Sequence, residues 1–337
     1  MNVLYTCDNN YAWLMGISLI SLFKKNKDIK DIDVFFIAEN LDVENRAKIE
    51  QIASEYERTV KIIDVDVTTF NLSNNFISLS RWPLSAFSRL YSANLLPTDI
   101  DKVLYIDCDT IINENISQLY DTDMKDKVFC GVKECISTKY KTNIGLTKKS
   151  NYINAGVMLI NLKLLRKENI AKLIDDFVKK YNQLICYADQ DVLNGIFSNR
   201  IGILNPGYNV MTIDKVRTYK EIMRLRKPYE FYSKEEILNA IENPKIIHYT
   251  TNLDVIRPWY SNSNHPYLKQ FMDSFNDSPW KNTKLEKYEF KAKQAKITSS
   301  IKKIKPQIIG DMILGFIYIY LRPNIIKLKY IMKFKGE

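Results

Sequence analysis

Two aspartates one residue apart are the strongest candidates for metal chemistry in this sequence. Asp107 ends the apolar run at residues 102–107, and Asp109 follows it after Cys108. If the backbone leaves extended geometry here, both carboxylates can turn toward one point and ligate a hard divalent cation such as Mg²⁺ or Mn²⁺. Such a cation can neutralise a nucleotide diphosphate as it leaves. Aspartates also cap loops, and the pair alone leaves that alternative open.

A histidine far along the chain is the candidate third ligand. His248 is one of only two histidines and follows the apolar pair at residues 246–247. Imidazole beside two carboxylates favours a metal softer than Mg²⁺, and Mn²⁺ is the natural candidate. The alternative is a histidine that is only hydrogen-bonded at a strand end. The other histidine, His265, precedes Pro266 in an Asn- and Ser-rich stretch and is predicted to lie at the surface.

The elements that must position these residues alternate between strand and helix patterns. Apolar runs predict buried strands, and helical spacing of apolar residues predicts helices. The alternation indicates an α/β fold with a mostly parallel sheet covered on both faces. Because ligands of such sheets bind beyond the carboxyl ends of the strands, Asp8 and Asp107 should face one crevice. The predicted strands are residues 3–7, 33–38, 60–65, 102–107 and 152–162, and the predicted helices are residues 13–23, 40–56, 84–96, 164–181 and 189–197.

The composition is typical of a globular protein with a large core, since 46% of the 337 residues are hydrophobic and 26% are charged. The five cysteines are an odd number without a CxxC spacing. This favours reduced thiols in a cytosolic compartment over a disulfide framework or a zinc site. The first residues lack the charged and apolar regions of a signal peptide. We therefore expect the catalytic part to stay in the cytoplasm.

The net charge of +10 is concentrated at one end of the chain. Residues 1–280 contain 35 Lys and Arg against 35 Asp and Glu, whereas residues 281–337 contain 14 against 4, a surplus of 10. The charge distribution therefore predicts a neutral domain at residues 1–280 and a basic helical tail at residues 281–337.

The tail combines lysines with an apolar stretch at residues 308–321. This stretch is short and contains Asp311, so it does not comfortably span about 30 Å of hydrocarbon. Apolar residues flanked by lysines are typical of an interfacial anchor on anionic lipid, at the inner face of the membrane. The alternative is a helical arm that packs on the body or on a second subunit. Nucleic-acid binding is disfavoured, because neutralising phosphates does not need an apolar stretch. The lysines are Lys284, Lys287, Lys291, Lys293, Lys296, Lys302, Lys303, Lys305, Lys327, Lys329, Lys333 and Lys335.

Six segments occur together in an order that resembles glycosyltransferase family eight, the group containing glycogenin and the bacterial lipopolysaccharide α-glycosyltransferases. They are YTCDNNY (5–11), SRL (88–90), VLYIDCD (103–109), NAGVMLINL (154–162), DQDVLN (189–194) and, more loosely, HY through PW (248–259). The resemblance covers about residues 1–260. It implies a GT-A fold, a Rossmann-like nucleotide-sugar domain and transfer with retention at the anomeric carbon.

The resemblance also implies a role for each matched residue. Residues near the first strand would contact uridine and ribose, an arginine would bind the donor's sugar or phosphate, and a triad would hold Mn²⁺. Three further residues would surround the transferred sugar, with Gln190 under the anomeric centre. The assignments are Thr6, Asp8 and Asn10 for the nucleoside, Arg89 for the donor, Asp107, Asp109 and His248 for the metal, and Asn154, Asp189 and Gln190 for the sugar. Asp8 as a turn residue, Arg89 in a surface ion pair and Asp189 as a helix N-cap remain open alternatives.

The last segment departs from the family pattern. The family often has a glycine and a lysine near the diphosphate after the histidine. Here Thr251 replaces the glycine, Arg257 replaces the lysine, and about three extra residues intervene. A guanidinium can still bind a phosphate, and Arg257 is the candidate for that contact.

The function that fits these observations is metal-dependent, retaining transfer of galactose or glucose from a UDP-sugar to a lipid-linked saccharide in bacterial surface glycan synthesis. Mn²⁺, or else Mg²⁺, is the expected cofactor. One alternative is a transferase with a protein acceptor, against which the tail counts. Another is a non-catalytic protein that binds sugar nucleotides or nucleic acid, which the metal triad and Gln190 disfavour.

Overall fold

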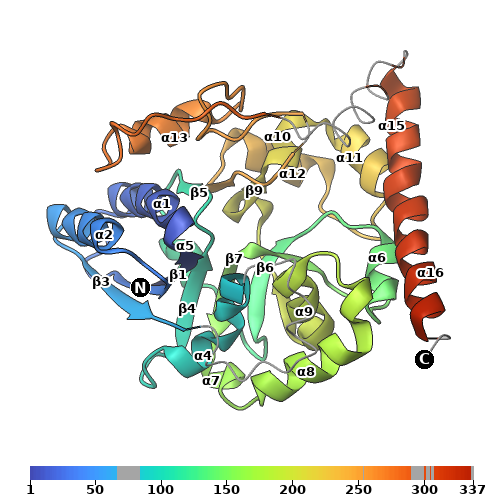
Figure 1. The fold of residues 1–337 in the computed structure, drawn as a ribbon, viewed down its shortest axis with the longest axis horizontal. Helices are drawn as coiled ribbons and strands as arrows, with labels where there is room; N and C mark the ends of the chain where they lie inside the picture. The colour runs from blue at the N-terminus through green and yellow to red at the C-terminus, as the bar shows by residue number, and fades with distance from the viewer. Residues whose placement is uncertain (67–83, 253, 290–299, 301–303, 305–306, 335–337) are drawn as a thin grey trace.

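A seven-stranded sheet forms the centre of the molecule in the computed structural model (Figure 1). The structure describes all residues except 67–83, 253, 290–299, 301–303, 305–306 and 335–337. Its strand order is β3-β2-β1-β4-β7-β6-β8. Neighbours are parallel except where β7 pairs with β4 and β6. The mostly parallel sheet is thus confirmed. The strands are β1 (Asn2–Asp8), β2 (Asp33–Glu39), β3 (Thr59–Asp64), β4 (Lys102–Ile106), β6 (Phe129–Lys133), β7 (Ile153–Asn161) and β8 (Ile201–Ile203).

Helices cover both faces of this sheet, and strand residues alternate between the two resulting cores. In β1, Val3 and Tyr5 pack into the core that includes α1 (Ala12–Lys25), α2 (Val43–Glu55) and α13 (Leu268–Phe275). Leu4 points the other way, into the core under α8 (Ile170–Tyr181) and α9 (Ala188–Phe197). Because both faces are buried, these strands are continuous apolar runs in the sequence.

A second, three-stranded sheet brings a distant segment to the end of β4. It has the order β5-β10-β9, with β5 at Thr110–Ile112, β10 at Ile246–His248 and β9 at Val210–Met211. His248 pairs with Thr110 on one side and Met211 on the other. Since β5 begins three residues after Asp107, this pairing fixes His248 beside the two aspartates.

The remaining elements are short. The segment predicted as one helix over residues 84–96 forms a 3-10 helix, Leu84–Tyr91, followed by one α-turn, α4 (Ser92–Leu95). The other helices are α5 (Ser117–Tyr120), α6 (Thr138–Asn143), α7 (Leu162–Leu165), α10 (Thr212–Val216), α11 (Tyr219–Arg226) and α12 (Lys234–Glu242), and further 3-10 turns lie at Asn9–Tyr11, Asn182–Leu184, Ser198–Arg200 and Pro206–Tyr208.

A long C-terminal helix lies along one side of the body, beside α11 and α6 (Figure 1). It comprises α15 (Gln307–Phe316), a π-helical turn (Ile317–Leu321) and α16 (Arg322–Phe334). Within the described residues, Ile308–Met332 is a helix long and apolar enough to cross a membrane by length and composition alone. Six tail lysines predicted to contact lipid, Lys291, Lys293, Lys296, Lys302, Lys303 and Lys305, lie outside the described residues, as does Lys335.

Candidate active site

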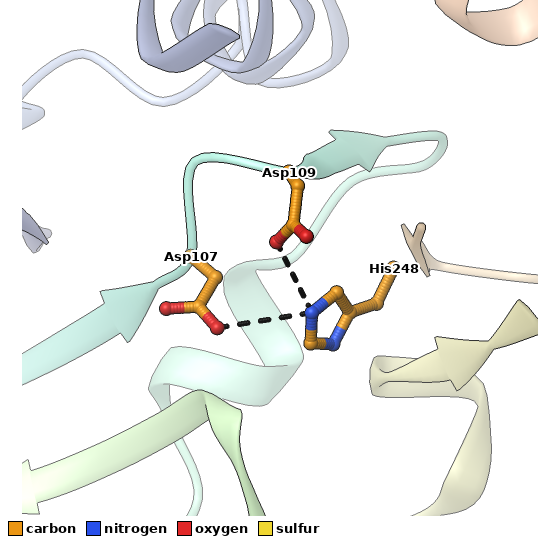
Figure 2. A group of neighbouring side chains, drawn as sticks. All are labelled: Asp107, Asp109 and His248. Atoms are coloured by element: carbon orange, nitrogen blue, oxygen red, sulfur yellow. Dashed lines mark ion pairs between the residues drawn. The ribbon is translucent and has the colours of Figure 1, made fainter. Parts of the chain in front are cut away.

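Two carboxylates and one imidazole converge on a single point (Figure 2). The Nε2 atom of His248 lies 3.2 Å from an oxygen of Asp109 and 3.7 Å from an oxygen of Asp107. The candidate ligand atoms of the three residues all lie within 4.8 Å of one another. The prediction that these distant residues form one cluster is confirmed.

The turn between β4 and β5 aims the two aspartates at this point. The amide of Asp107 still donates to Gly156 O of the neighbouring strand β7, at 2.7 Å. The Thr110 hydroxyl then donates to Asp107 O at 2.8 Å, which closes the turn. On the far side, the Tyr249 amide donates to Asp109 O at 2.9 Å. The backbone therefore leaves extended geometry between the two carboxylates, as a shared ligand position requires.

A buried amide sets the orientation of the imidazole. Asn209 donates from Nδ2 to the Asn154 side-chain oxygen at 2.9 Å, so its own Oδ1 faces His248 Nδ1 at 3.0 Å. Nδ1 must then carry a proton, and Nε2 is left to face the carboxylates. Burial alone lowers the pKa of His248, but Asp109 and then Asp107 outweigh it and raise that pKa above its ordinary value. A proton or a metal cation can therefore occupy the space between Nε2 and the carboxylates.

The donor set and the space around it fit a divalent cation. Two carboxylate groups and one imidazole, oriented by a second layer of hydrogen bonds, suit Mn²⁺ or a similar metal. The space is kept by a glycine. A Cβ at Gly156 would lie 2.2 Å from His248 Cε1, 2.7 Å from Nδ1 and 2.9 Å from an Asp107 carboxylate oxygen. No side chain fits there while the triad keeps its positions.

Arg89 joins the candidate metal ligand Asp107 to the candidate sugar-binding residue Asp189. Its guanidinium lies 3.0 Å from an Asp107 oxygen and 3.1 Å from an Asp189 oxygen, and it stacks on the Tyr105 ring at 4.4 Å. It also donates to Ala155 O at 2.8 Å. Burial raises the pKa of Asp189 to about 6, and Arg89 opposes that shift. Arg89 is thus a buried structural cation between the two sites, not a member of a surface ion pair.

Gln190 and Asn154 form a network beside Arg89. The Gln190 side-chain oxygen accepts from the amide of Ala155 at 3.0 Å and from Asn154 Nδ2 at 3.2 Å. Asn154 Nδ2 also donates to Glu134 at 2.9 Å, and Gln190 Nε2 donates to the Tyr152 hydroxyl at 3.3 Å. Through Asn154 and Asn209, hydrogen bonds connect Gln190 to His248. The candidate sugar-binding residues and the candidate metal site are therefore one connected assembly.

A family model described as glycosyl transferase family 8 matches residues 2–263, which contain this whole assembly. The chain belongs to glycosyl transferase family 8. The family resemblance drawn from the six segments is thus confirmed.

Two curated proteins and one solved structure are similar to this chain over most of its length. The chain is 27% identical over 293 residues to lipopolysaccharide 1,2-glucosyltransferase of Escherichia coli, which covers 85% of this chain and 81% of that protein. It is 24% identical over 283 residues to general stress protein A of Bacillus subtilis (strain 168), with 83% and 94% covered. The crystal structure of galactosyltransferase LgtC with donor and acceptor sugar analogues superposes with a TM-score of 0.71 at 23% identity, over 84% of this chain and 99% of that one. This likeness confirms the GT-A fold.

Thr6, Asp8 and Asn10, the residues expected to contact the nucleoside, lie at the end of β1 and directly after it. Asp8 caps the 3-10 turn after β1 by accepting from the amide of Tyr11 at 3.2 Å, and it lies 3.4 Å from the Asn10 amide nitrogen. Thr6 is buried, and its hydroxyl lies 3.2 Å from that of Tyr105. Asp8 is therefore a turn residue, and its second oxygen faces the side-chain amide of Asn10.

Arg257 also reaches the metal cluster despite the altered spacing around it. Its guanidinium lies 3.8 Å from an Asp109 oxygen, donates to the Thr251 hydroxyl and stacks on Trp259 at 5.0 Å. The extra residues in this family 8 segment therefore do not displace the cation from the site.

Sequence reasoning missed Asn209 and Glu134, which complete the network, because neither belongs to a recognised segment. It was wrong about His265, which is buried and not at the surface. His265 Nε2 lies 3.2 Å from the Thr212 hydroxyl, and Nδ1 accepts from the Tyr267 amide at 3.1 Å. Burial and then Arg257 lower its pKa to about 4, so it stays neutral and acts as a structural residue. Asp189 does not cap α9, because the cap residue is Tyr187. The Asp191 carboxylate instead accepts from the amides of Cys186 and Tyr187, which precede the helix.

Proposed function

We propose that this protein transfers galactose or glucose, with retention of anomeric configuration, from a UDP-sugar to a lipid-linked saccharide. The observation that carries the proposal is the Asp107–Asp109–His248 cluster and its hydrogen-bonded connection to Gln190. A nucleotide-sugar donor needs a metal site for its diphosphate and a hydrogen-bonding network for its sugar, and here the two candidates are connected.

Asp107, Asp109 and His248 would hold Mn²⁺, which when bound supplies positive charge to a diphosphate leaving group. Arg257 adds a second cation beside Asp109. Its planar guanidinium can donate two hydrogen bonds to phosphate oxygens. Asp8 and Asn10, with Thr6 behind them, would receive the uridine and ribose at the end of β1.

The transferred sugar would lie against Asn154, Asp189 and Gln190. Arg89 holds Asp189 in place, and Gln190 is fixed by the Ala155 amide and by Asn154. A carboxamide is a poor nucleophile but can stabilise developing positive charge, so Gln190 would act on the anomeric centre without a lasting covalent bond.

The C-terminal helix supports an acceptor at a membrane surface. Its outer side exposes ten large apolar side chains along about the whole helix, and Arg322, Lys327 and Lys329 lie between them. Such a surface favours the interface of an anionic bilayer. The name of the Escherichia coli relative, a lipopolysaccharide glucosyltransferase, points to the same class of acceptor. The exposed apolar residues are Ile308, Ile309, Met312, Ile313, Phe316, Leu321, Ile325, Leu328, Ile331 and Met332.

A donor screen tests the proposal. UDP-galactose, UDP-glucose, UDP-N-acetylglucosamine and UDP-N-acetylgalactosamine are incubated with the full chain and Mn²⁺, and UDP release is measured with and without a saccharide acceptor. Release from one of the first two donors, lost on adding a chelator, is expected. NMR of the product should show an α-linkage from the α-linked donor. A β-linked product, or no release from any donor, would refute the proposed reaction.

A further inference from the structure

A second hollow, separate from the metal cluster, begins beside Gln190. Its walls come from the end of β6, from α6 and the loop that follows it, and from the segment after α11. Four lysines line it, against two glutamates, which gives a surplus of two positive charges. We call it the lysine pocket and define it by Lys133, Lys141, Lys148, Lys149, Glu134 and Tyr229.

Two side chains are shared between the lysine pocket and the sugar network. Glu134 lines the pocket and accepts a hydrogen bond from Asn154 at 2.9 Å. Tyr152 also lines it, and its hydroxyl accepts from Gln190 Nε2 at 3.3 Å. The pocket-lining Tyr152 is therefore hydrogen-bonded directly to Gln190, the residue proposed to lie under the anomeric centre. A molecule that receives the sugar there would extend into the pocket.

Three of the four lysines of this pocket have no carboxylate partner among the described residues. Lys133 pairs with Glu230 at 2.7 Å, but within the described part of the chain Lys141, Lys148 and Lys149 form no ion pair with a carboxylate. Lys141 is 92% buried, and its ammonium donates only to the carbonyl oxygens of Lys148 and Ser150, at 2.7 and 2.6 Å. A partly buried ammonium without an ion-pair partner is costly, and a bound anion would lower that cost.

The far wall of the pocket is an aromatic ring. Tyr229 is exposed, and the Lys148 ammonium lies over its ring at 5.0 Å. The ring holds Lys148 at the pocket mouth through a cation–π contact, and its remaining surface can pack on a sugar. Lysine ammonium groups bind phosphate as point charges.

The elements that frame the pocket also hold the C-terminal helix. On α6, Asn143 donates to Pro323 O at 3.0 Å, and the Tyr140 ring packs on Tyr318 at 5.1 Å. At the end of α11, Arg226 stacks on the same Tyr318 at 3.9 Å. The pocket therefore lies next to the helix whose outer face is apolar and would approach a membrane. An acceptor held in that membrane would reach the pocket before it reaches Gln190.

We propose that the lysine pocket binds an anionic substituent, a phosphate or carboxylate, carried by the acceptor saccharide. This inference deepens the proposed function and rests on it for the identity of the acceptor. The anion would lie among Lys148, Lys149 and the buried Lys141, and its charge would select acceptors that carry a negative group close to the hydroxyl that is glycosylated.

Calorimetry with simple probes tests the pocket independently of transfer. The full chain is titrated in EDTA, which removes any metal-bound phosphate site, with glucose 6-phosphate and separately with glucose. The matched variants are Lys148→Gln/Lys149→Gln in the pocket and Lys163→Gln/Lys179→Gln on exposed helix surfaces. Lys141 is left intact because it holds loop carbonyls.

We expect glucose 6-phosphate to bind at least about tenfold more tightly than glucose. The pocket variant should lose this preference and the surface variant should keep it, because only the first removes charge from the anion. Equal binding of the two probes by the wild-type chain, or wild-type binding by the pocket variant, would overturn the proposal. These results do not depend on UDP release, so a failure of the donor screen would be recognised separately.

A lipid headgroup could supply the same phosphate chemistry, and vesicles distinguish the two sources. Sedimentation is measured with vesicles of phosphatidylglycerol and phosphatidylcholine. If the pocket variant binds vesicles like the surface variant, the anion belongs to the saccharide, as proposed. A selective loss of vesicle binding by the pocket variant, as large as its loss of glucose 6-phosphate binding, would assign the pocket to lipid and overturn the acceptor assignment.

Discussion

At the scale of single residues, removing the charge of Asp109 is the simplest test of the candidate metal site. Its carboxylate faces His248 at 3.2 Å and Arg257 at 3.8 Å. Asp109→Asn keeps the shape and removes the charge, so UDP affinity in Mn²⁺ should fall at least about tenfold, or about 1.4 kcal/mol. Calorimetry with and without chelator measures this, and exposed Asp273→Asn is the control. Equal UDP affinity of the wild-type chain in Mn²⁺ and in chelator would refute the metal assignment.

Gly156 tests whether space, as well as ligands, makes the metal site. A Cβ there would lie within 3.0 Å of both His248 and Asp107. Gly156→Ala should therefore push the ligands apart and weaken Mn²⁺ binding by about tenfold or more, because ligands must hold their geometry closely. Mn²⁺ titration followed by electron paramagnetic resonance checks it. Gly207→Ala, where the nearest atom is 3.1 Å from the added carbon, is the matched control and should bind Mn²⁺ like the wild type.

Gln190 should matter more to turnover than to binding. Its side chain is held by Ala155 and Asn154 and is proposed to face the developing charge. Gln190→Ala should therefore lower kcat by about tenfold or more with a smaller change in the KM for donor. Steady-state kinetics of UDP release measure both constants, with exposed Gln118→Ala as the control. A raised KM with unchanged kcat would show that Gln190 only binds the donor.

At the scale of elements, one buried carboxylate on the C-terminal helix explains why the helix docks. Asp311 is buried and lies 3.3 Å from Arg217 and 3.5 Å from Arg224. Gly315 lets the helix approach closely, since a Cβ there would lie 2.8 Å from Arg224 O. Farther along, the Tyr330 hydroxyl donates to Lys180 O at 2.9 Å. The C-terminal helix therefore packs on the body, as one alternative for the tail predicted. Its exposed face is still available for contact with a membrane.

Loss of the Asp311 charge should loosen this docking. Asp311→Asn removes a charge shared by Arg217 and Arg224, although Arg217 keeps its pair with Asp254. The change should cost about 1.5–3 kcal/mol, because hydrogen bonds to charged groups contribute about that much. We expect faster trypsin cleavage after Lys327 of α16, which is protected while the helix is docked. Mass spectrometry of timed digests measures the rate. The control variant Asp273→Asn should be digested at the wild-type rate. A wild-type digestion rate for Asp311→Asn would show that apolar contacts alone hold the helix and would contradict the prediction.

At the scale of the whole molecule, the net positive charge and the exposed apolar helix face both belong to the tail, apart from the candidate active site. The neutral part of the chain carries the candidate active site, and the helix with the exposed apolar face lies at one side of the body (Figure 1). Since the inner side of the helix is used for docking, we expect it to lie in the plane of the interface, not to span the bilayer.

Vesicle binding tests this arrangement. The triple variant Met312→Gln/Phe316→Gln/Leu328→Gln replaces exposed apolar residues of the helix with glutamine, which is a good helix former. It should weaken sedimentation with anionic vesicles by roughly tenfold to a hundredfold. The reason is that each apolar side chain, when fully buried in the bilayer, contributes up to about 1.5–3 kcal/mol to binding. Val43→Gln/Leu238→Gln, exposed on the body, is the control. High salt should weaken binding only in part, because the apolar share is not screened. Unchanged binding by the triple variant would contradict the membrane assignment.

The sequence by itself determined the sheet, the family and the three residues of the candidate metal site. Fully buried strands need apolar runs and helices need apolar spacing, so both are visible in a single chain. The metal ligands have few chemical alternatives, which is why Asp107, Asp109 and His248 could be named before their contacts were known. Charge counting likewise separated the tail from the body without reference to structure.

Only the tertiary structure decided what depends on contacts between distant residues. Asn209 orients His248, and Glu134 joins the sugar network to the lysine pocket, through hydrogen bonds that no local pattern encodes. His265 is buried because aromatic residues from separate segments surround it, although its own segment is polar. The sequence showed an apolar stretch only at residues 308–321, whereas the helix continues to Phe334, because lysines after residue 321 do not end a helix. Periodicity reports which face of an element is apolar, but packing determines what covers it.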